Sequence, residues 1–279
     1  MKQKIVIVGL GLIGGSLAKA FREYTDCSVY GIDRDESVTE NALSCGAIGK
    51  IGTPDDLRDA DIIFLCLYPR ACVEWTRAHL AFIRRGCLVT DTCGIKSWLC
   101  PRMEELAREG GFAFVGGHPM AGREKNGFAA SDGSLFRGAS YILVPCGAQR
   151  SAVEQLKGAV LPLGFSGAVE TTLEEHDRII AFTSQLPHVL ACSYVMSPQC
   201  PKHGGFSAGS YRDVSRVANI NETMWTELFL ENREALTEEL DTLTGHITEI
   251  RNAVAGGDAE TLRNLLRRGR LIKEGLGET

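Results

Sequence analysis

The sequence lacks the features that mark a metal centre, a disulfide scaffold or a membrane span. Its ten cysteines are scattered, with no Cys-x-x-Cys pair and no cysteine–histidine cluster at metal-ligand spacing. We therefore expect no metal, and we predict reduced, mostly buried thiols. The longest charge-poor stretch, residues 179–201, is interrupted by glutamine, proline, histidine and serine. That stretch indicates a buried helix rather than a membrane-spanning one.

A large excess of charge is also missing. The formal net charge is −5 over 279 residues, which gives no general attraction to nucleic acid or to a membrane surface. Any anionic ligand must therefore be held by local cations. The sequence shows no positively charged leader followed by an apolar run, so we expect a cytoplasmic protein. Its length and ordinary composition predict a globular protein of two domains.

A glycine-rich loop stands at the start of the sequence. The apolar, β-branched run of residues 4–8 predicts a buried parallel strand, and residues 16–24 predict an amphipathic helix. Between them, Gly9, Gly11 and Gly14 have the Gly-x-Gly-x-x-Gly spacing. In such loops the first glycine makes a tight turn, the second lets the backbone approach a pyrophosphate, and the third allows close helix–strand packing. The spacing therefore predicts a dinucleotide-binding loop.

An acidic residue completes this pattern. A second predicted strand, residues 28–32, ends in Asp33, whose carboxylate would accept hydrogen bonds from the adenosine ribose. Its charge would repel a 2′-phosphate, so Asp33 favours NAD over NADP. Arg34 would either stack on the adenine or attract that phosphate, which leaves some NADP use open. The loop residues Leu12 and Ile13 are expected to contact the cofactor as well.

Strand and helix patterns alternate through the first half of the chain, and only helical periodicity remains after Thr171. This order predicts an α/β protein with a Rossmann-type, doubly wound, mainly parallel sheet in residues 1–168. An all-helical C-terminal domain is expected in residues 169–279. The predicted strands are residues 62–67, 88–90, 112–115, 141–144 and 165–169, and the helical patterns cover residues 70–82, 96–108, 151–161, 173–197, 222–254 and 258–274.

The helical pattern of residues 222–254 is long for a globular protein and mixes apolar positions with charges. Such a helix either packs inside its own domain or finds its partner face on a second subunit. We favour a homodimer.

Three predicted strand ends carry residues that could bind ligands: residues 66–69, 90–96 and 116–122. Because the carboxyl ends of parallel strands meet at one edge of the sheet, these segments should converge on one crevice, with Leu67 and Thr92 beside the cofactor. His118 stands at the third of these ends among small residues. It is a candidate general base, the alternative being an ordinary surface or core histidine.

Several ordered motifs resemble one enzyme family. His118-Pro-Met-Ala-Gly122, followed by Glu124-Lys125, is similar to the signature of prephenate dehydrogenases and the related arogenate (cyclohexadienyl) dehydrogenases. Gln185-Leu-Pro-His188 resembles the Leu-Pro-His motif of that family, Arg212-Asp-Val-Ser-Arg216 resembles its Arg/Lys-Asp-x-x-Arg motif, and Trp225 follows at the matching distance. With the glycine loop and Asp91-x-x-x-x-Lys96, the resemblance covers nearly the whole chain.

The resemblance implies a reaction in tyrosine biosynthesis. Prephenate would lose a hydride to NAD from the ring carbon that bears its hydroxyl, and would lose its ring carboxylate as carbon dioxide, giving 4-hydroxyphenylpyruvate. The hydroxyl proton needs an acceptor, and neutral His118 suits that role. Arogenate is the near alternative substrate. More distantly, 3-hydroxyacid dehydrogenases also join a Rossmann domain to helices, but they rely on a lysine where this sequence has Gln185 and His188.

The resemblance also implies a substrate-binding set. Prephenate carries two carboxylates, and a guanidinium can bind a carboxylate with two hydrogen bonds, which suits Arg216. An α-helix would place Arg212 and Arg216 on one face. The other members are His188, Lys96, Glu124 and Trp225. Each of these residues also has an ordinary structural alternative. Arg216 would form a surface ion pair with Asp213, the histidine and the tryptophan would belong to the core, the lysine would cap the surface of its helix, and the glutamate would be a plain surface acid.

Three positions depart from the family's pattern. Many members have a serine where this sequence has Gly94, and its hydroxyl supports the catalytic histidine. We therefore expect a backbone group, a water or Thr92 to set the tautomer of His118. Gln185 stands where some members have a second histidine, and Arg123 replaces a small polar residue. These departures bear on substrate preference more than on the class of reaction.

Overall fold

The apolar run that precedes the glycine loop forms strand β1, inside an eight-stranded sheet. The computed structural model describes residues 2–277. The sheet order is β3-β2-β1-β4-β5-β6-β7-β8, and neighbouring strands are parallel except β6 and β7. The predicted doubly wound, mainly parallel sheet is confirmed. The strands are β1 (Lys4–Val8), β2 (Ser28–Ile32), β3 (Lys50–Ile51), β4 (Ile62–Leu65), β5 (Leu88–Asp91), β6 (Ala113–Pro119), β7 (Ser140–Val144) and β8 (Gly167–Glu170).

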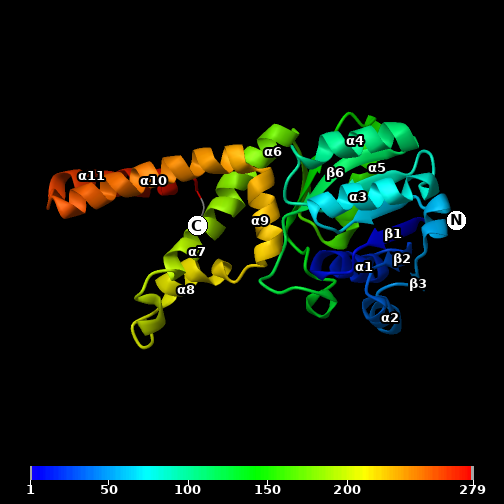
Figure 1. Cartoon of the computed structure of the whole chain (residues 1–279), viewed down its shortest axis with the longest axis horizontal. Helices are drawn as coiled ribbons and strands as arrows, with labels where there is room; N and C mark the ends of the chain where they lie inside the picture. Colours follow the sequence, from blue (N-terminus) through cyan, green and yellow to red (C-terminus); the bar gives the residue numbers. More distant parts are fainter. Residues whose placement is uncertain (1, 278–279) are drawn as a thin grey trace. The chain divides into compact units, whose positions relative to one another are not determined.

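Helices cover both faces of the sheet because alternate residues of each buried strand point to opposite sides. Ile5 and Ile7 pack into one apolar cluster with α1, α2 and α5, whereas Val6 and Val8 pack into a second cluster with α3 and α4. Each fully buried aliphatic side chain contributes about 1.5–3 kcal/mol to folding. Figure 1 shows α3 and α4 side by side. These helices are α1 (Leu12–Tyr24), α2 (Glu36–Ser44), α3 (Pro69–His79), α4 (Leu99–Gly110) and α5 (Arg150–Val160).

The remaining segments are helical, as the sequence predicts. A π-helical turn, Ala181–Gln185, joins the two helices α6 and α7. Short 3-10 turns cover Pro54–Asp59, Leu80–Phe82, Phe128–Ala130, Leu161–Leu163, Cys200–Lys202 and Arg216–Ala218. The helices are α6 (Leu173–Ile180), α7 (Leu186–Val195), α8 (Gly209–Ser215), α9 (Glu222–Glu231), α10 (Arg233–Ala255) and α11 (Ala259–Gly275).

The single long helix expected over residues 222–254 is wrong, because it is broken at Asn232 into α9 and α10. The buried side-chain amide of Asn232 donates hydrogen bonds to the carbonyl oxygen of Asp177 at 2.9 Å and to Oε1 of Gln185 at 2.8 Å. Asparagine is a weak helix former, and these contacts hold its side chain against the segment that joins α6 and α7.

The chain divides into two compact units, Met1–Asn232 and Arg233–Thr279. The second unit is formed by α10 and α11, which pack against each other. The predicted domain boundary at residue 168 lies within the first unit and stays a prediction. Among residues 2–277, no helix combines the length and the apolar character that a membrane crossing requires.

Candidate active site

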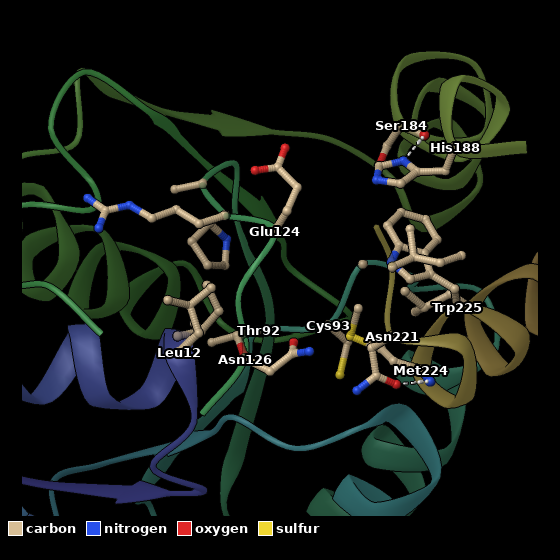
Figure 2. Close-up of a pocket in the computed structure, with 18 of the residues that line it drawn as sticks. Leu12, Thr92, Cys93, Glu124, Asn126, Ser184, His188, Asn221, Met224 and Trp225 are labelled. Atoms are coloured by element: carbon tan, nitrogen blue, oxygen red, sulfur yellow. Dashed lines mark hydrogen bonds between the residues drawn. The ribbon is translucent and has the colours of Figure 1, made fainter. Parts of the chain in front are cut away.

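A cavity of about 620 Å³ opens at the carboxyl ends of the parallel strands β1, β4, β5 and β6. Its other wall comes from the π-helical turn, α7, the turn that begins at Arg216, and α9. Figure 2 shows Leu12 and Thr92 on one side of this space and His188 with Trp225 on another. The lining brings together predicted cofactor positions (Gly11, Leu12, Ile13, Leu67 and Thr92) and predicted catalytic and substrate positions (His118, Glu124, His188, Arg216 and Trp225).

The glycine loop has the geometry that a dinucleotide requires. Gly9 has a φ of +87°, which side-chain-bearing residues rarely adopt, and a Cβ at Gly14 would lie 1.9 Å from the Gly9 carbonyl oxygen. A Cβ at Gly11, by contrast, would meet no atom of the described residues within 4 Å. Gly11 is also the N-cap of α1, so the N–H groups of the first turn meet no capping side chain there. The residues therefore fit a pyrophosphate at the helix N-terminus.

Asp33 is fixed beside this loop. Its Oδ2 accepts the Leu10 N–H at 2.7 Å and its Oδ1 accepts the Asp35 N–H at 3.0 Å. Asp33 and the exposed Arg34 lie outside the lining of the cavity. The contact of Asp33 with an adenosine ribose stays a prediction.

His118 lies in the last part of β6, where the strand is buried against its neighbours. A Cβ at the preceding Gly117 would come within 2.3 Å of the Tyr141 hydroxyl, so glycine is what lets β6 pack this closely. Nδ1 of His118 lies 2.9 Å from Nε2 of His176. Burial lowers the pKa of His118 well below its ordinary value, and positive charge on His176 or Lys96 acts in the same direction. The imidazole is therefore neutral near pH 7 and can accept a proton.

His176 and Asp177 are the site residues that sequence reasoning missed. Nδ1 of His176 lies 2.7 Å from Oδ1 of Asp177, and both side chains are almost fully buried. The sequence predicts a backbone group, a water or Thr92 beside His118, whereas the side chain that contacts Nδ1 of His118 is that of His176. The only signal in the sequence is a pair of adjacent ionisable residues in the helical pattern that leads into the Gln185–His188 motif. Their burial in the short helix α6 is known only from the structure.

Two charged side chains meet at the exposed edge of the cavity. Nη1 of Arg216 lies 2.8 Å from Oε1 of Glu124, and both side chains are exposed. Arg216 therefore pairs with Glu124 instead of Asp213, the partner that a surface-helix role would have required.

His188 is held by two contacts. Its Nδ1 lies 2.7 Å from the Ser184 carbonyl oxygen (Figure 2), and its ring stacks on Trp225 with the centroids 3.8 Å apart. A carbonyl oxygen only accepts, so Nδ1 carries the hydrogen, and Nε2 of the neutral ring is an acceptor. Burial lowers the pKa of His188, although the bond to Ser184 opposes this shift.

Lys96 and Arg212 are corrections to the predicted substrate-binding set. Lys96 is fully buried outside the cavity, where its Nζ donates to Oδ2 of Asp91 at 2.5 Å and to the Cys93 carbonyl oxygen at 2.9 Å. Arg212 is exposed and also lies outside the cavity. Arg216 is the C-cap of α8 in a right-handed helical conformation, and its N–H donates to the Arg212 carbonyl oxygen, so the two arginines lie one helical turn apart, as their spacing predicts.

Gln185 lines the cavity, but its amide is already occupied. Its Nε2 donates to the Leu228 carbonyl oxygen at 3.2 Å and its Oε1 accepts from Asn232. Gln185 thus joins the π-helical turn to α9. Among residues 2–277, no group of three or more histidine, cysteine or acidic side chains is placed to hold a metal ion.

Comparison with known proteins places this geometry in one family. Residues 17–166 match the model of the prephenate dehydrogenase nucleotide-binding domain, and residues 172–268 match that of the prephenate dehydrogenase dimerization domain. The prephenate dehydrogenase of Bacillus subtilis is 32% identical over 99% of this chain and 76% of its own length. The cyclohexadienyl dehydrogenase of Zymomonas mobilis is 31% identical over 92% of this chain and 90% of its own length.

A solved structure agrees over the whole length. Prephenate dehydrogenase from Aquifex aeolicus, in complex with hydroxyphenyl propionate and NAD+, superposes with a TM-score of 0.87 at 26% identity, over 99% of each chain. Two consecutive domain models of one family thus match the sequence in the expected order, and the fold matches throughout. The chain belongs to the prephenate dehydrogenase family.

Proposed function

We propose that this protein catalyses the NAD-dependent oxidative decarboxylation of prephenate to 4-hydroxyphenylpyruvate, a step in tyrosine biosynthesis. The observation that carries the proposal is that His118 and Arg216 line the same cavity as Gly11. A proton acceptor, a cation for a carboxylate and a dinucleotide loop are the three groups that this reaction requires.

Bound NAD supplies the hydride acceptor. The chain would hold its pyrophosphate at Gly11 and the start of α1, its adenosine ribose at Asp33, and its nicotinamide half near Leu67 and Thr92. This assignment is supported by the open space at Gly11 and by the fixed carboxylate of Asp33.

His118 would handle one proton in each turnover. As the hydride leaves the ring carbon, the hydroxyl on that carbon becomes a carbonyl, and Nε2 of His118 takes its proton. The bond to the ring carboxylate then breaks, carbon dioxide leaves, and the electron pair of that bond makes the ring aromatic. His118 returns the proton to the phenolate oxygen. Such a positioned base contributes about 10²–10⁴-fold to the rate.

The helical segments would hold the rest of the substrate. Arg216 would exchange Glu124 for a substrate carboxylate, and the stacked pair of His188 and Trp225 would form a wall of the substrate pocket, since all four side chains line the cavity. The ring carboxylate of prephenate leaves as carbon dioxide. We therefore expect Arg216 to bind the carboxylate of the side chain, which stays in the product.

Arogenate is the second candidate substrate. It differs from prephenate in its side chain, which carries an ammonium group that needs a hydrogen-bond acceptor. Neutral His188 has an acceptor at Nε2, since Nδ1 donates to Ser184, and an acceptor suits an ammonium better than a keto group. A cyclohexadienyl dehydrogenase is among the relatives that match this chain.

We further propose that residues 1–168 form the nucleotide-binding domain and that residues 169–279 form a helical domain through which two chains form a homodimer. The match of residues 172–268 to a dimerization domain supports this organisation. So do apolar side chains that α10 and α11 expose, namely Ile247, Val254, Leu266, Leu271 and Ile272.

One assay tests the function. Purified protein is supplied with prephenate or arogenate, each with NAD or NADP, while the reduced nicotinamide is followed by its absorbance. We expect the largest kcat/KM for prephenate with NAD. A larger value for arogenate would move the assignment to the second candidate, and an absence of turnover with both ring substrates would contradict the proposal.

A further inference from the structure

Three side chains, two of them almost fully buried, form a hydrogen-bonded line that ends at the cavity. His118 contacts His176, and His176 contacts Asp177, at 2.9 and 2.7 Å. His176 and Asp177 are 2% and 3% exposed. They are therefore too buried to touch the substrate, so any role in the reaction must act through His118.

The line starts from a carboxylate that its surroundings fix in place. Oδ1 of Asp177 accepts the Lys96 N–H at 2.8 Å, and Oδ2 accepts the Ser97 N–H at 2.7 Å. Asn232 holds the backbone of the same residue through its carbonyl oxygen. Although burial raises the pKa of Asp177, its hydrogen bonds outweigh burial and lower it. The group is thus a carboxylate that only accepts hydrogen bonds.

The charge of Asp177 determines which nitrogen of each histidine carries a hydrogen. Because Asp177 only accepts, Nδ1 of His176 must carry a hydrogen. Burial lowers the pKa of His176, so the ring is neutral and its Nε2 is an acceptor. Nδ1 of His118 must then donate to it, which leaves the lone pair of the His118 ring on Nε2.

The opposite side of His118 has no competing protein group at position 94. A Cβ at Gly94 would lie 3.8 Å from Cε1 and 3.9 Å from Nε2 of His118, and Gly94 lines the cavity. A glycine can offer no side-chain hydrogen bond there. The tautomer is therefore controlled from Nδ1.

We propose that His176 and Asp177 are positioning residues that hold His118 in the tautomer with Nδ1 protonated, so that Nε2 presents its lone pair to the cavity. The inference rests on the proposed function of His118 as the proton acceptor. In place of a side-chain hydroxyl at position 94, these two residues of α6 would support His118.

The direct test is the tautomer itself. In the full-length protein labelled with ¹⁵N, two-dimensional spectra of the imidazole nitrogens report which nitrogen is protonated, and the His118 signals are identified by their loss in His118→Asn. We expect protonated Nδ1 in the unsubstituted chain. In Asp177→Asn, the new amide can donate to His176, which reverses the line and moves the His118 proton to Nε2. A His118 ring protonated at Nε2 in the unsubstituted chain would overturn the proposal.

Kinetics provide the second readout. Asp177→Asn should lower kcat by ~10²–10⁴-fold, which is the contribution expected of a correctly positioned general base, with the KM values for prephenate and NAD within about threefold. A fall in kcat without movement of the His118 proton, or an unchanged kcat, would count against the proposal.

Two substitutions of His176 separate positioning from folding. His176→Gln keeps an oxygen that can accept from Nδ1 of His118, and we expect kcat within ~10-fold of the unsubstituted chain. His176→Phe keeps the ring volume without an acceptor, and we expect a loss of ~10²-fold or more. Equal losses in both variants would contradict the proposal. The spectra need no substrate, so a failure of the unsubstituted chain to turn over prephenate would reject the proposed function and leave the tautomer test intact.

Discussion

Nη1 of Arg216 lies 2.8 Å from Oε1 of Glu124, and this pair joins the segment after β6 to the turn after α8 at the edge of the cavity. The two side chains are 66% and 41% exposed. An ion pair this exposed contributes only about 0–1 kcal/mol. A substrate carboxylate can therefore replace Glu124 at Arg216 with little loss.

Arg216→Ala should raise the KM for prephenate by ~10-fold or more while kcat changes little, because the lost contact binds substrate and transition state alike. Steady-state kinetics measure both constants. Arg212→Ala is the matched control, since Arg212 is an exposed arginine of the same segment that lies outside the cavity. Equal KM values for the two variants would return Arg216 to a surface role.

Glu124→Gln should lower the KM for prephenate by ~2–5-fold, because the substitution removes the carboxylate that competes for Arg216. The same steady-state assay applies. If Glu124 instead serves to orient Arg216 for the substrate, the KM for prephenate will rise. That result would exclude the replacement of Glu124 by a substrate carboxylate at Arg216.

His118→Asn should lower kcat by ~10²-fold or more, as expected for the loss of a general base. The dissociation constant for NAD, measured by fluorescence titration, should stay within about twofold, since the substitution leaves the glycine loop intact. His79→Asn provides the control, because His79 lies at the end of α3, outside the cavity. A His118→Asn variant that keeps full turnover would remove His118 from the mechanism.

Lys96→Met should lower the free energy of unfolding by ~3–5 kcal/mol, because it leaves the Asp91 carboxylate buried without its cation. Burial alone lowers the pKa of Lys96, but Asp91 outweighs burial and raises it, so the lysine is charged. Urea denaturation measures the change. The double variant Asp91→Asn/Lys96→Met should recover part of the loss, and a single variant as stable as the unsubstituted chain would refute this role.

Asp33→Asn should shift the ratio of kcat/KM values from NAD toward NADP by at least ~10-fold, because it removes the charge that repels a 2′-phosphate. The amide oxygen can still accept the N–H of Leu10, so the loop should keep its geometry. Kinetics with both cofactors at saturating prephenate give the ratio. An unchanged ratio would mean that Asp33 does not face the ribose.

Stability should fall as the pH drops through the range of an ordinary histidine. Burial lowers the pKa of both His118 and His176 in the folded chain, so the unfolded chain binds protons first as the pH falls below ~6.5. The urea midpoint should therefore be lower at about pH 5.5 than at about pH 7.5. His118→Asn should reduce the difference between the two midpoints, because it removes one of the two titrating rings. A midpoint that rises on acidification would contradict the neutral, buried state of the two rings.

The sequence predicted those parts of the fold that depend on local pattern. The apolar run of β1, the glycine loop and the alternation of strands and helices each leave a periodic or spaced signature, and the sheet forms as they predict. The convergence of the three strand ends was predicted for the same reason, because parallel strands bring their carboxyl ends to one edge. Leu67, Thr92 and His118 accordingly line one cavity.

Contacts that form only when the chain packs could not be predicted from the sequence. The charge of Lys96 suggests a ligand, but Asp91 already neutralises it in the core. The break at Asn232 follows from hydrogen bonds to α6 and the π-helical turn, which no local pattern reveals.

Residue type and spacing along the chain are enough to identify the chemical groups that the protein carries and the segments that form strands and helices. Which of those groups act together depends on how the chain packs in three dimensions. His118 and His176 are 58 positions apart, and Glu124 and Arg216 are 92 positions apart. Each pair meets only after the helical segments pack on the edge of the sheet. Burial and hydrogen bonding then fix the proton on His118, because those depend on neighbours in space.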